Sequence, residues 1–138
     1  AEEELPAESV HFKTMIHKIH TGEDLDQPFE IAGFSSLIDF GEVRFPGDLS
    51  KCEICHEEDT YELPLPEEAL STVVLDDNDE LFLEKLPIRA TCTSCHDALI
   101  TEIHSILATD DVSRVESCAV CHGSDADFSV LDVHGLNN

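Results

Sequence analysis

Residues 52–56 have the sequence CEICH, and the same CxxCH pattern returns as CTSCH at 92–96 and as CAVCH at 118–122. These three motifs use every cysteine of the 138-residue chain. CxxCH is the attachment pattern of c-type haem. The two cysteines lie close enough to form thioethers with the porphyrin vinyl groups, and the histidine that follows can ligate the iron. We therefore predict three haem c groups, bound through Cys52, Cys55, Cys92, Cys95, Cys118 and Cys121, with His56, His96 and His122 as proximal iron ligands.

Other chemistry fits these motifs less well. Zinc sites do use CxxC pairs, but six thiolates in three pairs do not suit a four-ligand site. A thioredoxin-like redox pair is normally single and lies near a βαβ unit, for which this sequence has no pattern. A disulfide framework would not place a histidine after every pair.

A haem that only transfers electrons usually has a second axial ligand, either histidine or methionine. Met15, the only methionine, shares an apolar helical stripe with Phe12 and Ile19, so we expect it to pack rather than to bind iron. The candidates for the second, distal position are the other five histidines, His11, His17, His20, His104 and His134.

Two of these candidates belong to a helix predicted over residues 9–21, with Ser9 as N-cap and Gly22 as the stop. His17 and His20 lie three residues apart on it. Together they could hold one tetrahedral metal, but they cannot take opposite sides of one haem iron. We therefore expect them to reach two different haems.

The two later candidates follow the second and third motifs. His104 comes eight residues after His96, about 12 Å along a helix. A helix that leaves the second haem cannot return to the far side of its iron, so we expect His104 to serve another haem, such as the third. His134 could serve any of the three.

Long periodic segments are scarce in the rest of the chain. We predict a loop over 22–50 with a turn at 45–48, an extended stretch at 61–68, a hairpin over 71–83 turning at Asp77-Asn78, and helices at 94–108 and 112–121. With no Trp and one Met, the chain offers little core material. We expect a small single domain over residues 1–138, mostly α and irregular loop with little β, wrapped around three haems.

The charge excludes some partners. Asp and Glu total 31 against 7 Lys and Arg, a formal charge of −24. Nucleic acid needs a basic surface, so we expect no nucleic-acid partner. The charge favours a solvated acidic surface that promotes solubility and mutual repulsion, with a cationic partner as the alternative. The acidic run at 76–80 could bind calcium, but it lacks the glycine and spacing of an EF-hand loop, which favours an acidic turn.

The expected location is extracytoplasmic, with the extracellular space or cell surface favoured over the periplasm. Covalent haem attachment takes place outside the bacterial cytoplasm. No stretch reaches the roughly 20 apolar residues of a membrane span. The start at Ala1, before three glutamates, is what we expect of a processed mature protein.

Three longer stretches carry a family resemblance: FKTMIHKIHTGEDL at 12–25, DFGEVRFPGDLSKCEICH at 39–56 and TYELPLP at 60–66. They resemble the outer-membrane decahaem c-type cytochromes of metal-reducing bacteria, over about residues 11–134. The resemblance implies closely packed bis-histidine haems that form an electron path, here matching the last three haems of a pentahaem domain.

By that resemblance His17 and His20 are distal ligands, with His104 and His134 as further candidates. Three haems need only three distal ligands. We therefore expect His11 and one of His104 or His134 to be the surplus pair.

These observations favour a non-enzymatic electron carrier. We expect extracellular electron transfer to redox partner proteins or extracellular acceptors, with a homopolymeric filament, joined by haem-to-haem contact between subunits, as a possible assembly. The alternatives are a soluble, monomeric periplasmic shuttle and a multihaem reductase with one open haem. Bis-histidine ligation without methionine predicts low reduction potentials.

Overall fold

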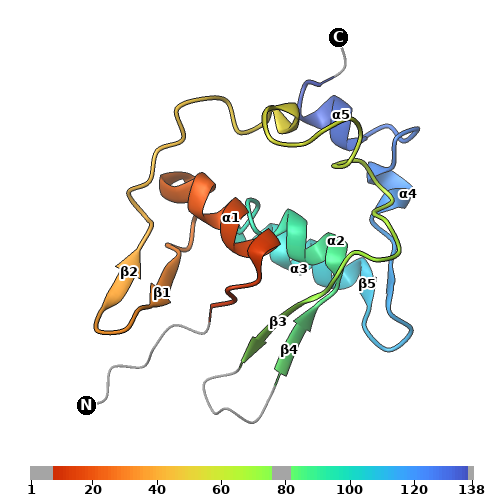
Figure 1. Ribbon diagram of the computed structural model, residues 1–138. Helices are drawn as coiled ribbons and strands as arrows, with labels where there is room; N and C mark the ends of the chain where they lie inside the picture. The colour runs from red at the N-terminus through yellow and green to blue at the C-terminus, as the bar shows by residue number, and fades with distance from the viewer. Residues whose placement is uncertain (1–7, 76–81, 137–138) are drawn as a thin grey trace.

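The computed structural model describes residues 8–75 and 82–136 of the chain. The acidic run at 76–80, expected to be a turn and considered as a calcium site, and the turn at Asp77-Asn78 lie outside these residues. In Figure 1, helices α1 (Phe12–Thr21), α2 (Pro87–Cys92) and α3 (Leu99–Leu107) occupy the middle of the molecule. Two hairpins extend to one side of them and α5 (Val130–Val133) lies on the other. The remaining helical turns are η1 (Gly22–Asp24), η2 (Cys52–Ile54) and α4 (Ala119–His122).

Helix α1 ends where the sequence predicts but begins three residues later than predicted. Gly22 terminates it with a positive φ of 49°, a conformation that favours glycine. At the other end, the Ser9 hydroxyl accepts a hydrogen bond from the backbone N–H of His11 (3.1 Å). The Ser9 side chain therefore forms a local turn with His11 and does not cap the helix. The first helical residue is Phe12.

The second half contains shorter helices than expected. The predicted helix 94–108 is confirmed only from Leu99 to Leu107, because the backbone of the second CxxCH motif turns first. The N–H groups of Cys95 and His96 both bond to the Cys92 carbonyl. Helix α2, which was not predicted, precedes that motif and starts at Pro87, where the missing N–H costs nothing.

Within residues 8–75 and 82–136 the strands form three two-stranded antiparallel sheets. The predicted hairpin is confirmed as β3 (Thr72–Leu75) paired with β4 (Phe82–Lys85). The loop predicted over 22–50 contains a further hairpin, β1 (Glu30–Ala32) with β2 (Leu37–Asp39). These strands are only three residues long, too short to give an alternating pattern in the sequence.

Two other predictions were wrong. The helix expected over 112–121 is replaced by β6 (Val115–Glu116), which pairs with β5 (Thr109–Asp110), and by the four-residue α4. Arg114 has a φ of 58° in the connecting turn, which a helix cannot accommodate. In the stretch 61–68, turns and bends at 61–64 and 67–68 interrupt the continuous extended segment that was expected, and the Leu63–Pro64 bond is cis.

The protein core is small. Among the described residues the buried apolar side chains are Leu25, Phe29, Leu63, Leu86, Ile88 and Ala90. A folded chain of 15.3 kDa is expected to expose roughly 7,100 Å². This chain exposes 9672 Å², and many large apolar side chains contribute to that surface. The polypeptide by itself therefore leaves much apolar area uncovered, and a bound apolar group would cover part of it.

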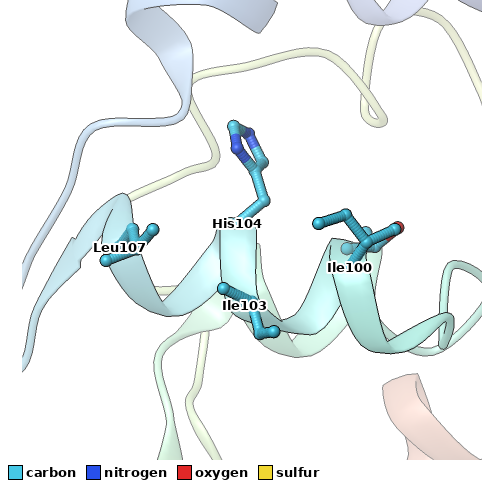
Figure 2. A pocket seen from close by; sticks show the side chains of 5 residues that line it. Ile100, Ile103, His104 and Leu107 are labelled. Atoms are coloured by element: carbon cyan, nitrogen blue, oxygen red, sulfur yellow. The ribbon is translucent and has the colours of Figure 1, made fainter.

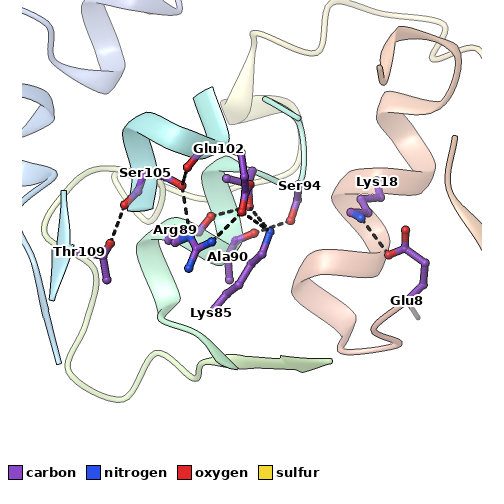
Figure 3. A network of polar contacts seen from close by, with 10 residues as sticks. Glu8, Lys18, Lys85, Arg89, Ala90, Ser94, Glu102, Ser105 and Thr109 are labelled. Carbon is purple, nitrogen blue, oxygen red and sulfur yellow. Dashed lines mark hydrogen bonds and ion pairs between the residues drawn. The ribbon is translucent and has the colours of Figure 1, made fainter. Parts of the chain in front are cut away.

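Charged and polar contacts hold the central helices together (Figure 3). The Glu102 carboxylate of α3 accepts hydrogen bonds or ion pairs from Lys85 (3.0 Å) and from Arg89 of α2 (2.7 Å). Burial opposes ionisation of Glu102, but the two cations outweigh it and lower its pKa. The Glu116 carboxylate accepts the backbone N–H groups of Ile88 (3.0 Å) and Arg89 (2.6 Å). Glu116 thus caps α2 from the segment that leads into the third CxxCH motif.

Candidate functional site: three paired histidines

Each proximal histidine of a CxxCH motif lies beside one histidine from elsewhere in the chain. The ring of His56 in the first motif is 6.0 Å from that of His17, between ring centroids. In the second motif His96 is 6.0 Å from His134. In the third motif His122 is 6.4 Å from His104. The three pairs, called sites 1, 2 and 3 below in motif order, use six of the eight histidines.

These spacings fit two imidazoles on opposite sides of one metal ion. An imidazole ring with bonds near 1.33 Å has a radius of about 1.1 Å. Metal–imidazole bonds are about 2.0–2.1 Å long, so the two centroids should be about 6.2–6.4 Å apart. The observed range of 6.0 to 6.4 Å agrees with this distance at all three sites. The residues present therefore fit an iron between each pair, next to the cysteines of a CxxCH motif.

Hydrogen bonds orient several of these rings. The Nδ1 atoms of His17 and His134 lie 2.6 and 2.7 Å from the backbone carbonyls four residues earlier, on Lys13 and Val130. A carbonyl can only accept, so Nδ1 must carry the proton and Nε2 keeps the lone pair that a metal needs. His122 Nδ1 makes the same kind of bond to the Phe128 carbonyl (2.8 Å).

At site 1 the proximal ring is also held. His56 Nδ1 lies 3.3 Å from the Thr60 hydroxyl oxygen. That hydroxyl donates its own proton to the Glu57 carbonyl (2.9 Å), so towards His56 it can only accept. Sequence reasoning did not identify Thr60 or the carbonyl partners. Their spacing could have identified these partners, because each lies four residues from its histidine along the chain, before His17 and His134 and after His56.

Burial keeps the proton affinity of two rings low. Burial is the main cause that lowers the pKa of His17, against the hydrogen bond to the Lys13 carbonyl. Burial, followed by the charge of His134, lowers the pKa of His96. Both rings are therefore biased towards the neutral form, which is the form that ligates metals.

An apolar recess lies beside site 3 (Figure 2). Ile100, Ile103, His104 and Leu107, together with Thr101, line a cavity of ≈ 410 Å³ on α3. Figure 2 shows the His104 ring standing away from the helix, with Ile100 and Leu107 on either side of it. Ile100 is 74% and Leu107 82% exposed in the polypeptide. Such side chains next to a ligating ring are suited to contact a porphyrin face.

The two remaining histidines face no proximal histidine. The His20 ring packs edge-on against Phe45, with centroids 5.6 Å apart. His11 Nδ1 is 3.3 Å from the Thr72 hydroxyl, which also contacts the buried Thr14 (2.8 Å). The expectation paired His20 with a haem and left one of His104 or His134 as surplus. The geometry instead pairs both His104 and His134 and leaves His11 and His20 outside the three sites.

Shared segments of the chain link site 1 to site 2 and site 2 to site 3. Helix α1 connects sites 1 and 2, because His17 faces the first motif and the Thr21 hydroxyl oxygen lies 3.1 Å from Cys95 Sγ of the second. The Lys51 ammonium, next to the first motif, donates to the Gly135 carbonyl (3.0 Å), directly after His134.

Sites 2 and 3 share another segment. Residues 128–134 hold His122 through the Phe128 carbonyl and present His134 to His96. The cysteines of the second motif are close enough to those of the other two motifs for their charges to act on one another. Burial and then the neighbouring charges of Cys118 and Glu116 raise the pKa of Cys92 to about 11. Burial also raises the pKa of Cys52, to which the charge of Cys95 adds.

The cysteines are all free thiols in the polypeptide and form no disulfide. Within residues 8–75 and 82–136, no group of three or more His, Cys, Asp or Glu side chains is arranged to hold a metal ion. His17 and His20 therefore do not form part of such a cluster there. In the same residues, no helix is long and apolar enough to cross a membrane.

A comparison with protein families identifies the chain. The model of outer membrane cytochromes, MtrC/MtrF-like, domains II/IV, matches residues 1–135. The chain belongs to this family. No curated protein and no solved structure matches it. Membership confirms the resemblance seen in the sequence and identifies a multihaem c-type cytochrome with a role in extracellular electron transfer. It also supports haem c as the cofactor and an extracytoplasmic location.

Proposed function

We propose that this chain is a three-haem electron-transfer unit in which His17, His134 and His104 are the distal ligands of the first, second and third haems. The observation that carries the proposal is the pairing of each CxxCH histidine with one of these rings at 6.0 to 6.4 Å. When bound, haem iron supplies reversible one-electron redox chemistry.

The chain's own residues bind and orient the cofactors. Six cysteines supply thioethers, and six histidines supply axial nitrogen ligands. The carbonyls of Lys13, Val130 and Phe128 fix the tautomer and the direction of three of these rings. Exposed apolar side chains such as Ile100 and Leu107 provide surface for the porphyrin and exclude water from it.

The shared elements support a linear path from site 1 through site 2 to site 3. Helix α1 spans sites 1 and 2, and the segment 128–134 spans sites 2 and 3. An electron that enters at either end then passes the middle site before it leaves. A reductase would need one proximal histidine without a partner ring, so the pairing favours electron transfer over the reductase alternative.

The test is a set of alanine variants in the haem-loaded protein. His17→Ala, His104→Ala and His134→Ala should each convert one haem of three from low-spin to high-spin, seen in optical and electron paramagnetic resonance (EPR) spectra. His11→Ala and His20→Ala are matched controls, since they also remove an imidazole but should leave all three haems low-spin. A pyridine haemochrome assay should count three haem c groups in every variant.

The opposite pattern would overturn the assignment. If His20→Ala gives a high-spin haem and His104→Ala or His134→Ala does not, the distal ligands are not the paired histidines. If the wild-type protein already contains a high-spin haem that binds carbon monoxide readily, the reductase alternative replaces electron transfer.

Assembly and partners rest on the charge and on family membership. With a formal charge of −24, the surface is suited to a cationic redox partner and repels copies of itself at low ionic strength. The filament remains a prediction. Electron microscopy of native material tests it, because a monodisperse particle of about 15 kDa without filaments would exclude it.

A further inference from the structure

The three sites differ in how their rings are hydrogen-bonded. At site 1 both rings have an Nδ1 partner, the Lys13 carbonyl for His17 and the Thr60 hydroxyl for His56. At site 2 the His134 Nδ1 donates to the Val130 carbonyl, and at site 3 the His122 Nδ1 donates to the Phe128 carbonyl. Within the described residues, site 1 is therefore the one whose two rings both donate through Nδ1.

This difference bears on the iron through the ligand nitrogen. A ring that donates its Nδ1 proton to an acceptor gains electron density at Nε2 and becomes a more basic ligand. A more basic ligand stabilises ferric iron over ferrous iron and so lowers the reduction potential. Two such rings act on the same iron at site 1, whereas one acts at each of the other sites.

Local charge acts in the same direction. Residues 52–62 around site 1 contain five carboxylates, Glu53, Glu57, Glu58, Asp59 and Glu62. The stretches of equal length that begin at the other two motifs, 92–102 and 118–128, contain two acidic residues each. Negative charge also favours the ferric state. The ammonium groups of Lys13, near His17, and of Lys51, directly before Cys52, oppose this effect in part, but the carboxylates outnumber them.

We infer that site 1 has the lowest reduction potential of the three. In this inference Thr60 is a positioning residue, whose hydroxyl oxygen accepts the hydrogen bond from His56 Nδ1 and so lowers the potential. The inference rests on the proposed function, in which these rings ligate three haems. It gives the first step of the path a direction, with electrons favoured to leave site 1 for site 2.

The ring planes provide a spectroscopic label for each site. The two rings make an angle of 10° at site 1, 51° at site 2 and 88° at site 3. In low-spin ferric haem, parallel imidazole planes split the two iron dπ orbitals, dxz and dyz, which overlap with the π systems of the ligands, and give a rhombic EPR spectrum. Perpendicular planes leave those orbitals nearly equal in energy and give one strongly shifted feature at low field. Site 1 should therefore give the rhombic signal.

The experiment is a redox titration of the haem-loaded protein followed by EPR. As the potential is lowered, the rhombic signal should be the last to disappear. Thr60→Val keeps the side-chain shape but removes the acceptor, and it should shift the midpoint of the rhombic signal alone to a higher potential. Thr60→Ser should restore the wild-type midpoint. Thr109→Val is the matched control, since that hydroxyl donates to the Ser105 carbonyl and touches no imidazole.

The outcomes separate the inference from the proposed function. Three low-spin signals with the rhombic one reduced first, or a Thr60→Val midpoint equal to that of Thr109→Val, would overturn the inference and leave the function in place. A high-spin signal in the wild-type protein would overturn both. A rhombic signal that disappears last and responds to Thr60→Val supports the inference.

Discussion

Removal of the Glu116 carboxylate should weaken the connection between the second and third haem motifs. Glu116 is half-buried and accepts two N–H groups in the first turn of α2, at 3.0 and 2.6 Å from the nitrogens of Ile88 and Arg89. Hydrogen bonds to a charged group contribute about 1.5–3 kcal/mol each, whereas loss of a helix cap usually costs about 0.5–2 kcal/mol. Because water can reach the freed N–H groups in part, we expect Glu116→Ala to cost about 2 kcal/mol.

The assay is urea unfolding of the haem-loaded protein followed by far-UV circular dichroism. With an m value near the middle of the usual range of about 1–3 kcal/mol per M, a loss of about 2 kcal/mol lowers the midpoint by about 1 M. Glu23→Ala is the control, because Glu23 pairs with Arg44 at the surface, where the side chains are 43% and 81% exposed. That pair should contribute about 0–1 kcal/mol. Equal midpoints for the two variants would refute the capping role.

Three further predictions concern stability. Gly22→Ala should lower the unfolding free energy by more than about 1–3 kcal/mol, since it adds backbone strain and a clash of the new Cβ with the Val43 carbonyl. Gly135→Ala is also at positive φ, but nothing lies within 4 Å of its Cβ, so it should cost only the strain. Urea midpoints compare the two variants. Phe29→Ala should cost about 3–5 kcal/mol in the same assay, because Phe29 is fully buried; a loss below 1 kcal/mol would contradict its role in the core. The Arg114 guanidinium lowers the pKa of Glu84 from 4.5 to about 2, so the stability that this pair contributes is present above pH 4.5 and is lost as the pH falls towards 2. Glu84→Gln should therefore lose less stability over that interval than the wild type, and equal losses in urea titrations would count against the pair.

The haem-attachment motifs were readable from the sequence because covalent attachment requires fixed local spacing. Three CxxCH copies are enough to predict haem c as the cofactor without any knowledge of the fold. Local signals also located the end of α1 at Gly22 and the β3–β4 hairpin. In each of these cases the deciding interaction lies within a few residues of the signal.

Pairing of the distal histidines depends instead on contacts between distant segments. Helical spacing indicated that His104 should leave the second motif, and its ring does lie beside His122 of the third. No local pattern could show that His134 would reach His96, because that contact requires the chain to turn after Phe128. The helix predicted over 112–121 failed for a similar reason, since strand pairing between 109–110 and 115–116 overrides helical propensity.

The central claim is that three specific histidine pairs hold the three irons. An experimental structure of the haem-loaded protein that resolves the axial ligands tests it most directly. The account predicts His17 opposite His56, His134 opposite His96 and His104 opposite His122. His11 or His20 on any of these three irons would contradict it.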